Sequence, residues 1–135
     1  MQKRLLPFGG FLGSLSVILG ALAAHGLKSK LGTGLITESN LQAFDTAARY
    51  QMYHSIALLA MAFLIEKFHP KLIIAAAYCF IIGIVLFSGS IYILSTSRLI
   101  GLENVHWLGP VTPIGGLFFV FGWVFIAISG IKNNK

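Results

Sequence analysis

The sequence predicts an all-α integral membrane protein, a single domain over residues 1–135 that folds as a four-helix transmembrane bundle. The composition is the first reason, because 56% of the residues are hydrophobic and only 10% are charged, whereas a soluble domain carries roughly 25% charged residues. The second reason is a series of long apolar runs, with expected spans of about 5–25, 44–66, 72–97 and 111–131. Each run has about the 20 residues or more that a helix needs to cross the hydrocarbon core.

Basic residues stand at the ends of these runs and give the predicted topology. Six flank the side of both termini: Lys3, Arg4, Lys67, Lys71, Lys132 and Lys135. Three flank the opposite side: Lys28, Lys30 and Arg98. This excess of positive charge predicts cytoplasmic N- and C-termini, in a multi-pass protein of the bacterial cytoplasmic (inner) membrane. The net charge of +6 therefore points to anionic lipid headgroups, with no nucleic acid as a partner.

The first run carries a stripe of small residues. Their spacing of four and three puts them on one helix face: Gly9, Gly13, Ser16, Gly20 and Ala23. Such a face lets another backbone come close, so we favour close packing within the bundle, with a homodimer seam as the alternative. The basic start and the Ala-Leu-Ala at 21–23 also fit a cleaved signal peptide, but the glycine content favours a packed span. Gly26 is predicted to end this helix.

The second run opens with a polar stretch, FDTAARYQMYHS at 44–55. Residues 39–42 (SNLQ) are typical of a capping box that begins the helix. In lipid, each polar group of the stretch costs free energy unless water or another group satisfies it. Asp45 and Arg49 are four residues apart and are expected to pair along the helix. The stretch therefore predicts an internal polar site around which the other spans pack.

The third and fourth spans bring further polar and small residues to the same depth. The short turn at 66–71 makes the second and third helices antiparallel neighbours. The polar part of the third helix and the start of the fourth then lie at the end where the polar stretch begins. The residues concerned are Ser88, Gly89, Ser90 and Tyr92 in the third span and Thr112, Gly115 and Gly116 in the fourth.

The polar residues thus gather in the outer half of the expected bundle, which predicts a polar cavity there. The candidate ligand-binding residues are His25, Asp45, Arg49, Tyr50, Gln51, His54, Ser88, Ser90, Tyr92 and Thr112. The candidate helix-packing residues are Gly9, Gly13, Ser16, Gly20, Ala23, Gly89, Gly115 and Gly116. We favour binding or permeation of a small polar or anionic molecule or a lipid headgroup, because an intramembrane arginine and histidine are costly ways to hold helices together. The alternative is a structural or accessory membrane subunit with no ligand of its own.

Catalytic and metal-binding patterns do not occur in the sequence. It contains no HExxH, CxxC, GxGxxG, GxSxG or P-loop motif, and its single cysteine, Cys79, cannot form an internal disulfide. We therefore expect no enzyme, no cofactor and no metal site, and an intramembrane enzyme that uses His54 and Ser88 is the weaker alternative. The expected partners are membrane lipids, and a homo-oligomer is a further arrangement that the small-residue face allows.

Four ordered motifs carry a resemblance to a known family. They are GALAAHG at 20–26, YQMYH at 50–54, FSGSIY at 87–92 and GPVTPIGG at 109–116, the last followed by Gly122 and Trp123. In these motifs the chain resembles the YgdD/YwdK-type family of small bacterial inner-membrane proteins, and the resemblance covers nearly the whole chain. It implies four transmembrane helices and no particular activity.

Overall fold

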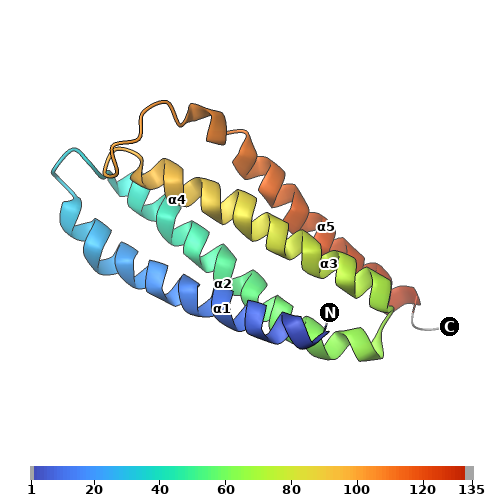
Figure 1. Cartoon of the computed structure of the whole chain (residues 1–135). Coiled ribbons are helices and arrows are strands. Elements are labelled where there is room, and N and C mark those ends of the chain that lie inside the picture. Colours follow the sequence, from blue (N-terminus) through green and yellow to red (C-terminus); the bar gives the residue numbers. More distant parts are fainter. Residues whose placement is uncertain (1, 133–135) are drawn as a thin grey trace.

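The computed structural model describes residues 2–132, which form helices joined by short connections, with no strand among them. The described chain runs along the bundle four times, in alternating directions, so that the start of α1 and the end of α5 lie at the same end of the molecule (Figure 1). Lys135, one of the basic residues on the predicted side of the termini, lies outside the described residues. The opposite end of the bundle, where 31–37 and 97–110 connect the helices, is called the far end below.

The helical segments follow the chain in this order. The first pass is α1 (Gln2–Ala21), which continues into a π-helical turn, η1 (Leu22–Leu27), and a 3-10 turn, η2 (Lys28–Lys30). The long helix α2 (Glu38–Lys67) returns along the bundle. The third pass consists of α3 (Pro70–Gly83), a π-helical turn, η3 (Ile84–Ser88), and α4 (Gly89–Thr96). After the 3-10 turn η4 (His106–Leu108), α5 (Val111–Lys132) makes the last pass.

Three of the described passes are long and apolar enough to cross a membrane: Lys3–Lys30, Pro70–Thr96 and His106–Lys132. The fourth helix, α2, has 30 residues, which is about 45 Å of helix. It carries the polar stretch of the second run, including Asp45 and Arg49. The bundle therefore combines three apolar passes with one helix that is polar over part of its length.

The start of α2 is capped two residues before the predicted position. Thr37 is the N-cap: its hydroxyl oxygen accepts a hydrogen bond from the backbone N–H of Asn40 at 3.1 Å. In return, the side-chain oxygen of Asn40 accepts from the backbone N–H of Thr37 at 3.1 Å. The capping box predicted at 39–42 is therefore wrong, because Thr37 and Asn40 satisfy each other's backbone groups two residues earlier along the chain.

The first pass does not end at Gly26, as the sequence predicts. Gly26 lies inside η1, and the helical conformation continues to Lys30. A glycine at a helix end commonly takes a left-handed conformation, and the glycines that do so come later, Gly32 with φ +82° and Gly34 with φ +81°. His25 is therefore an exposed residue within a helical turn and does not cap a helix end.

The passes pack with α2 in the middle. Along one side α2 packs against α1, and along the other it packs against α3, η3 and α4, while α5 covers α3 and η3. Two groups of buried apolar side chains fill these contacts. One group includes Leu5, Met61 and Phe80, and the other, at the far end, includes Leu27 and Phe44. Because α2 has neighbours on both sides, the polar residues that face them, such as Gln51 and His54, are buried.

Glycines bring α5 close to the third pass. A Cβ atom at Gly115 would overlap the backbone of Phe87 in η3, and one at Gly122 would overlap the ring of Phe80 in α3. A Cβ atom at Gly83 would lie 2.5 Å from a ring carbon of α5. These three glycines therefore set the separation of the two passes. Gly115 is among the predicted packing residues, whereas Gly83 and Gly122 are not.

The small residues of α1 contact α2 along part of the predicted stripe. A Cβ atom at Gly9 would lie 2.9 Å from the side chain of Leu59, and one at Gly13 would lie 3.7 Å from Ser55. Ser16 and Ala23 of the same stripe are buried. The face that the spacing predicts is thus the face that α1 turns towards α2.

Two predicted packing positions do not lie at a close helix contact. A Cβ atom at Gly20 or at Gly89 would meet nothing within 4 Å. At Gly116 the added atom would make an ordinary contact, 3.8 Å from the ring of Phe87. The spacing of small residues predicts a face of the helix, but it does not say how far along that face the neighbouring helix stays close.

Candidate functional site

The middle of α2 is buried although it carries polar side chains. The exposed fractions of Gln51, His54 and Ser55 are 2%, 4% and 1%. Apolar residues of the same region, such as Ala47 and Leu58, are also fully buried. Residues that recur every three to four positions share one helix face. Most of the buried residues of α2 follow this spacing, from Phe44 to Ala62, whereas Arg49 and Tyr53 between them are exposed.

Gln51 joins three passes through its side-chain amide. Its Nε2 donates a hydrogen bond to the backbone carbonyl of Leu12 in α1 at 2.8 Å. Its Oε1 accepts a hydrogen bond from the hydroxyl of Tyr92 in α4 at 2.9 Å. The amide nitrogen and the amide oxygen of Gln51 are therefore bound to two different passes. Another molecule could bind either atom in their place only by breaking one of these hydrogen bonds.

Two serines of neighbouring passes bind the backbone of α2. Ser16 of α1 donates to the carbonyl of Ala48 at 2.7 Å, and Ser88 at the end of η3 donates to the carbonyl of Ala47 at 2.9 Å. A carbonyl oxygen has two lone pairs, so each can accept these bonds in addition to its bond within the helix. The small alanines at 47 and 48 leave room for both serines to approach.

His54 uses both of its ring nitrogens. Trp123 of α5 donates its indole N–H to Nε2 at 3.2 Å. Because an indole nitrogen can only donate, Nε2 must accept, and the proton of the neutral ring is therefore on Nδ1. That nitrogen lies 2.7 Å from the carbonyl of Tyr50 and donates to it. The ring also stacks on Phe119, with centroids 3.6 Å apart and planes at 8°.

A further pair of hydroxyls joins α4 to α5. The hydroxyl oxygens of Ser90 and Thr112 are 2.6 Å apart, and either can be the donor. Ser90 is also 3.0 Å from the carbonyl of Phe87, to which it donates. When it does so, the Thr112 hydroxyl donates to Ser90 and both groups are satisfied.

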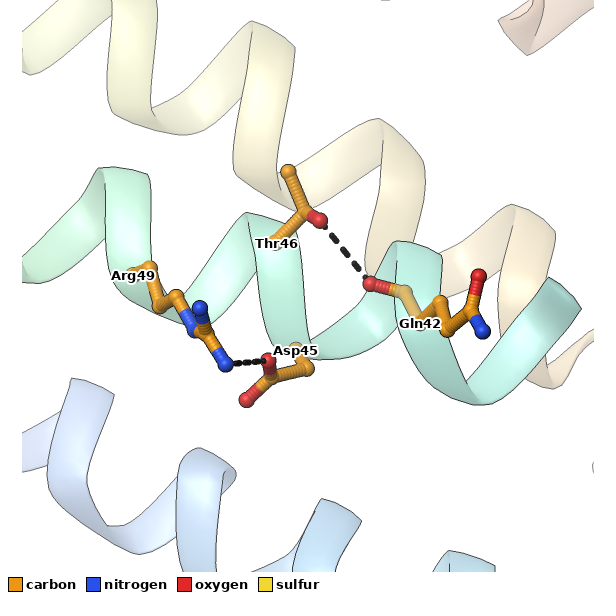
Figure 2. A network of polar contacts seen from close by, with 4 residues as sticks. All are labelled: Gln42, Asp45, Thr46 and Arg49. Atoms are coloured by element: carbon orange, nitrogen blue, oxygen red, sulfur yellow. Dashed lines mark hydrogen bonds and ion pairs between the residues drawn. The ribbon is translucent and has the colours of Figure 1, made fainter. Parts of the chain in front are cut away.

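Asp45 and Arg49 form the pair that the spacing predicts, but they lie at the surface. A guanidinium nitrogen of Arg49 is 2.6 Å from a carboxylate oxygen of Asp45, and the two side chains are 66% and 41% exposed. Figure 2 shows the pair on α2, beside a second contact in which the hydroxyl of Thr46 donates to the carbonyl of Gln42 at 2.9 Å. An exposed pair of this kind contributes only about 0–1 kcal/mol.

The structure therefore divides the predicted ligand-binding residues between the interior and the surface. Gln51, His54 and Ser88 are buried and bound by the chain itself. Arg49 and His25 are exposed. Arg49 and His54 are five residues apart, which is about 140° around the helix, so their side chains leave α2 in different directions. α2 therefore does not bring the side chains of Arg49 and His54 together in one cavity.

Trp123 is 50% exposed and binds His54, although it is not among the residues predicted from the sequence to form the site. It lies four residues after Phe119, on the same face of α5, and both rings contact His54. A signal for it exists in the sequence, because the N–H of a tryptophan inside a bundle needs an acceptor. His54 is the histidine of α2, and its ring nitrogen can accept a hydrogen bond from the tryptophan N–H.

The described part of the chain leaves no buried side-chain nitrogen or oxygen without a hydrogen-bond partner. It also contains no group of three histidine, cysteine, aspartate or glutamate residues that could hold a metal ion. The polar residues that bind α2 or lie on its buried face thus form a set of helix-to-helix contacts, which we call the α2 contact set: Ser16, Gln51, His54, Ser88, Tyr92 and Trp123.

These features define a helical protein of the multi-pass membrane class, in which one partly polar helix is held by three apolar passes. Within that class, the chain belongs to the family described as "Protein of unknown function (DUF423)", whose model matches residues 19–116. The resemblance that the four motifs carry is confirmed by these matches and by similar bacterial proteins. No solved structure is significantly similar to the chain.

The similar proteins match along nearly their whole length. The UPF0382 membrane protein YwdK of Bacillus subtilis is 37% identical over 132 residues, which are 97% of this chain and 98% of the relative. A UPF0382 membrane protein of Haemophilus influenzae is 35% identical over 135 residues, 100% of this chain and 99% of the relative. A third, from Staphylococcus haemolyticus, is 35% identical over 131 residues. Their names and the apolar passes agree on a membrane location.

Replacing Gln51 by leucine should destabilise the bundle. The change keeps the side-chain volume close to the original but leaves the Leu12 carbonyl and the Tyr92 hydroxyl without their shared partner. We expect a loss of about 1–2 kcal/mol, the range for polar contacts between membrane helices, measured by thermal unfolding in detergent. Gln42→Leu is the matched control, because Gln42 is exposed on the same helix. Equal melting temperatures for the two variants would contradict the role assigned to Gln51.

Proposed function

We propose that this protein is a structural or accessory subunit of the bacterial cytoplasmic membrane, with lipids as partners and no ligand of its own in its interior. The supporting observation is that both ends of the Gln51 amide and both ring nitrogens of His54 are bound by groups of the same chain. The interior polar residues therefore favour this alternative over the binding or permeation that the sequence favours. A second copy of the chain is an additional partner that the exposed faces of α1 and α5 allow.

The proposal gives the chain no catalytic step. An intramembrane hydrolase built on His54 and Ser88 would need the imidazole to take the proton of the serine hydroxyl. In the described structure the Ser88 hydroxyl instead donates to the Ala47 carbonyl, and both imidazole nitrogens have other partners. These contacts support a non-enzymatic role.

The proposed orientation has both termini in the cytoplasm. Six basic residues flank the end with the termini and three flank the far end. A charge excess next to membrane spans favours the cytoplasmic side. The exposed polar residues of the connections at the far end would then face outwards.

Single-cysteine labelling in intact cells tests this orientation, in a Cys79→Ser background that removes the native thiol. A membrane-impermeant maleimide should label cysteines placed at Lys30 and Glu103 from outside. It should label cysteines at Lys67 and Lys135 only after the cells are opened, because the cytoplasmic side is out of its reach. Labelling of the Lys67 position in intact cells would reverse the proposed orientation.

Binding of an anionic group at Arg49 is the second candidate function, and one observation favours it. The Arg49 side chain is 66% exposed, and one of its guanidinium nitrogens contacts the Asp45 carboxylate. Guanidinium groups offer five N–H donors, so several donors stay available to a phosphate or carboxylate. A lipid headgroup could therefore bind at this position on the side of α2 without entering the α2 contact set.

Native mass spectrometry of the protein extracted from its own membrane separates the two candidates. For a structural subunit, wild type and Arg49→Gln should carry the same lipid and small-molecule adducts, and their melting temperatures should differ little because the ion pair is exposed. For a headgroup site at Arg49, Arg49→Gln should lose anionic lipid adducts, whereas Lys28→Gln, which removes an exposed charge elsewhere, should keep them. A stoichiometric small molecule that is lost in Arg49→Gln would overturn the first candidate.

A further inference from the structure

A cavity of about 350 Å³ lies at the far end of the bundle. It lies between the start of α2, the end of α4 and the beginning of η4. Figure 1 shows that these three segments lie at the end opposite the termini. The volume is at the lower end of the range for small-molecule sites. None of the residues predicted from the sequence to bind a ligand lines it.

The cavity is lined by hydrogen-bond donors and by one fixed positive charge. Arg98, His106 and Asn40 line it, and no aspartate or glutamate is among the described residues that do so. The side-chain oxygen of Asn40 is occupied by the backbone N–H and hydroxyl of Thr37. This fixes the orientation of the Asn40 amide and leaves its NH₂ group as a donor. The polar lining is therefore suited to an acceptor with negative charge.

Ser95 is the second observation that points to a ligand. It is 5% exposed and lines the cavity. The neighbouring hydroxyls bond back to their own helix: Thr96 to the Tyr92 carbonyl at 2.7 Å and Ser97 to the Leu94 carbonyl at 3.1 Å. The Ser95 hydroxyl has no hydrogen-bond partner among the described residues. Because no buried side-chain oxygen of the described residues lacks a partner, this hydroxyl is accessible from the cavity, where it can donate to a ligand.

We propose that this cavity binds a small anion that carries a carboxylate or phosphate group. Arg98 supplies the positive charge, and Ser95 and Asn40 supply directed hydrogen bonds to the oxygens of the anion. Leu94 and Val105 line the same cavity and would contact a short apolar part of the molecule. Such an anion could be a free solute or the headgroup of a phospholipid, since the site lies at an end of the bundle. The proposal does not depend on the structural role given to the α2 contact set.

The matched set of variants consists of Arg98→Gln, Ser95→Ala and two controls. Lys30→Gln removes a positive charge at the same end of the bundle from a residue that does not line the cavity. Arg49→Gln tests the other candidate anion site. Ser95→Ala is the mildest change and keeps the helix, so it still tests the site if Arg98→Gln does not fold.

Two assays distinguish the sources of the anion. In a non-ionic detergent, inorganic phosphate and acetate are titrated at constant ionic strength, and binding is followed by the melting temperature and by calorimetry. In nanodiscs, retention of phosphatidylglycerol is compared with that of phosphatidylcholine by native mass spectrometry.

For a free solute we expect saturable binding of phosphate or acetate to wild type and to both controls, weakened at least tenfold in Arg98→Gln and several-fold in Ser95→Ala. For a headgroup we expect the same order of variants in the retention of phosphatidylglycerol. The proposal is overturned if neither assay shows binding that depends on Arg98. It is also overturned if Arg49→Gln abolishes the binding while Arg98→Gln preserves it.

Discussion

The structure depends on one constraint: a polar group inside a membrane bundle has to be satisfied by another group of the same protein. The second run of the sequence puts polar side chains in the middle of a long helix, and the fold places that helix between its neighbours. Gln51 is the clearest case, because its amide bonds α1 on one side and α4 on the other. Polar residues make α2 poorly suited to span a membrane by itself. Some of the same residues, such as Gln51, form the hydrogen bonds that hold α2 to the other passes.

The other passes follow from the same constraint. They carry few groups that need a partner, so they can turn apolar side chains outwards, as Phe11 and Ile18 of α1 and Phe121 of α5 do. Several of the polar groups that they do carry point to α2 or to each other: Ser88 donates to a carbonyl of α2, and Ser90 binds Thr112. Close contacts at glycines such as Gly115 bring α5 near enough to the third pass for its tryptophan to reach α2.

Much of this arrangement could be predicted from the sequence, because it depends on length, periodicity and charge. The all-helical class and the Asp45–Arg49 pair are of this kind, and both are confirmed. The features that were wrong or missed depend on three-dimensional neighbours. The cap at Thr37 depends on how the preceding connection turns, and the open space at Gly20 depends on which side chains lie beside it. The separation of Arg49 from His54 is different, because helix geometry alone puts them about 140° apart.

Hydrogen exchange of the Gln51 side-chain amide, followed by NMR in detergent, is the most direct test of the central claim that α2 is held by interior polar contacts. The amide protons of exposed Gln42 provide an internal reference on the same helix. If Gln51 is bound to Leu12 and Tyr92 inside the bundle, its side-chain protons should persist after transfer to heavy water, while those of Gln42 should disappear at once. Exchange at the same rate for both glutamines would contradict the account.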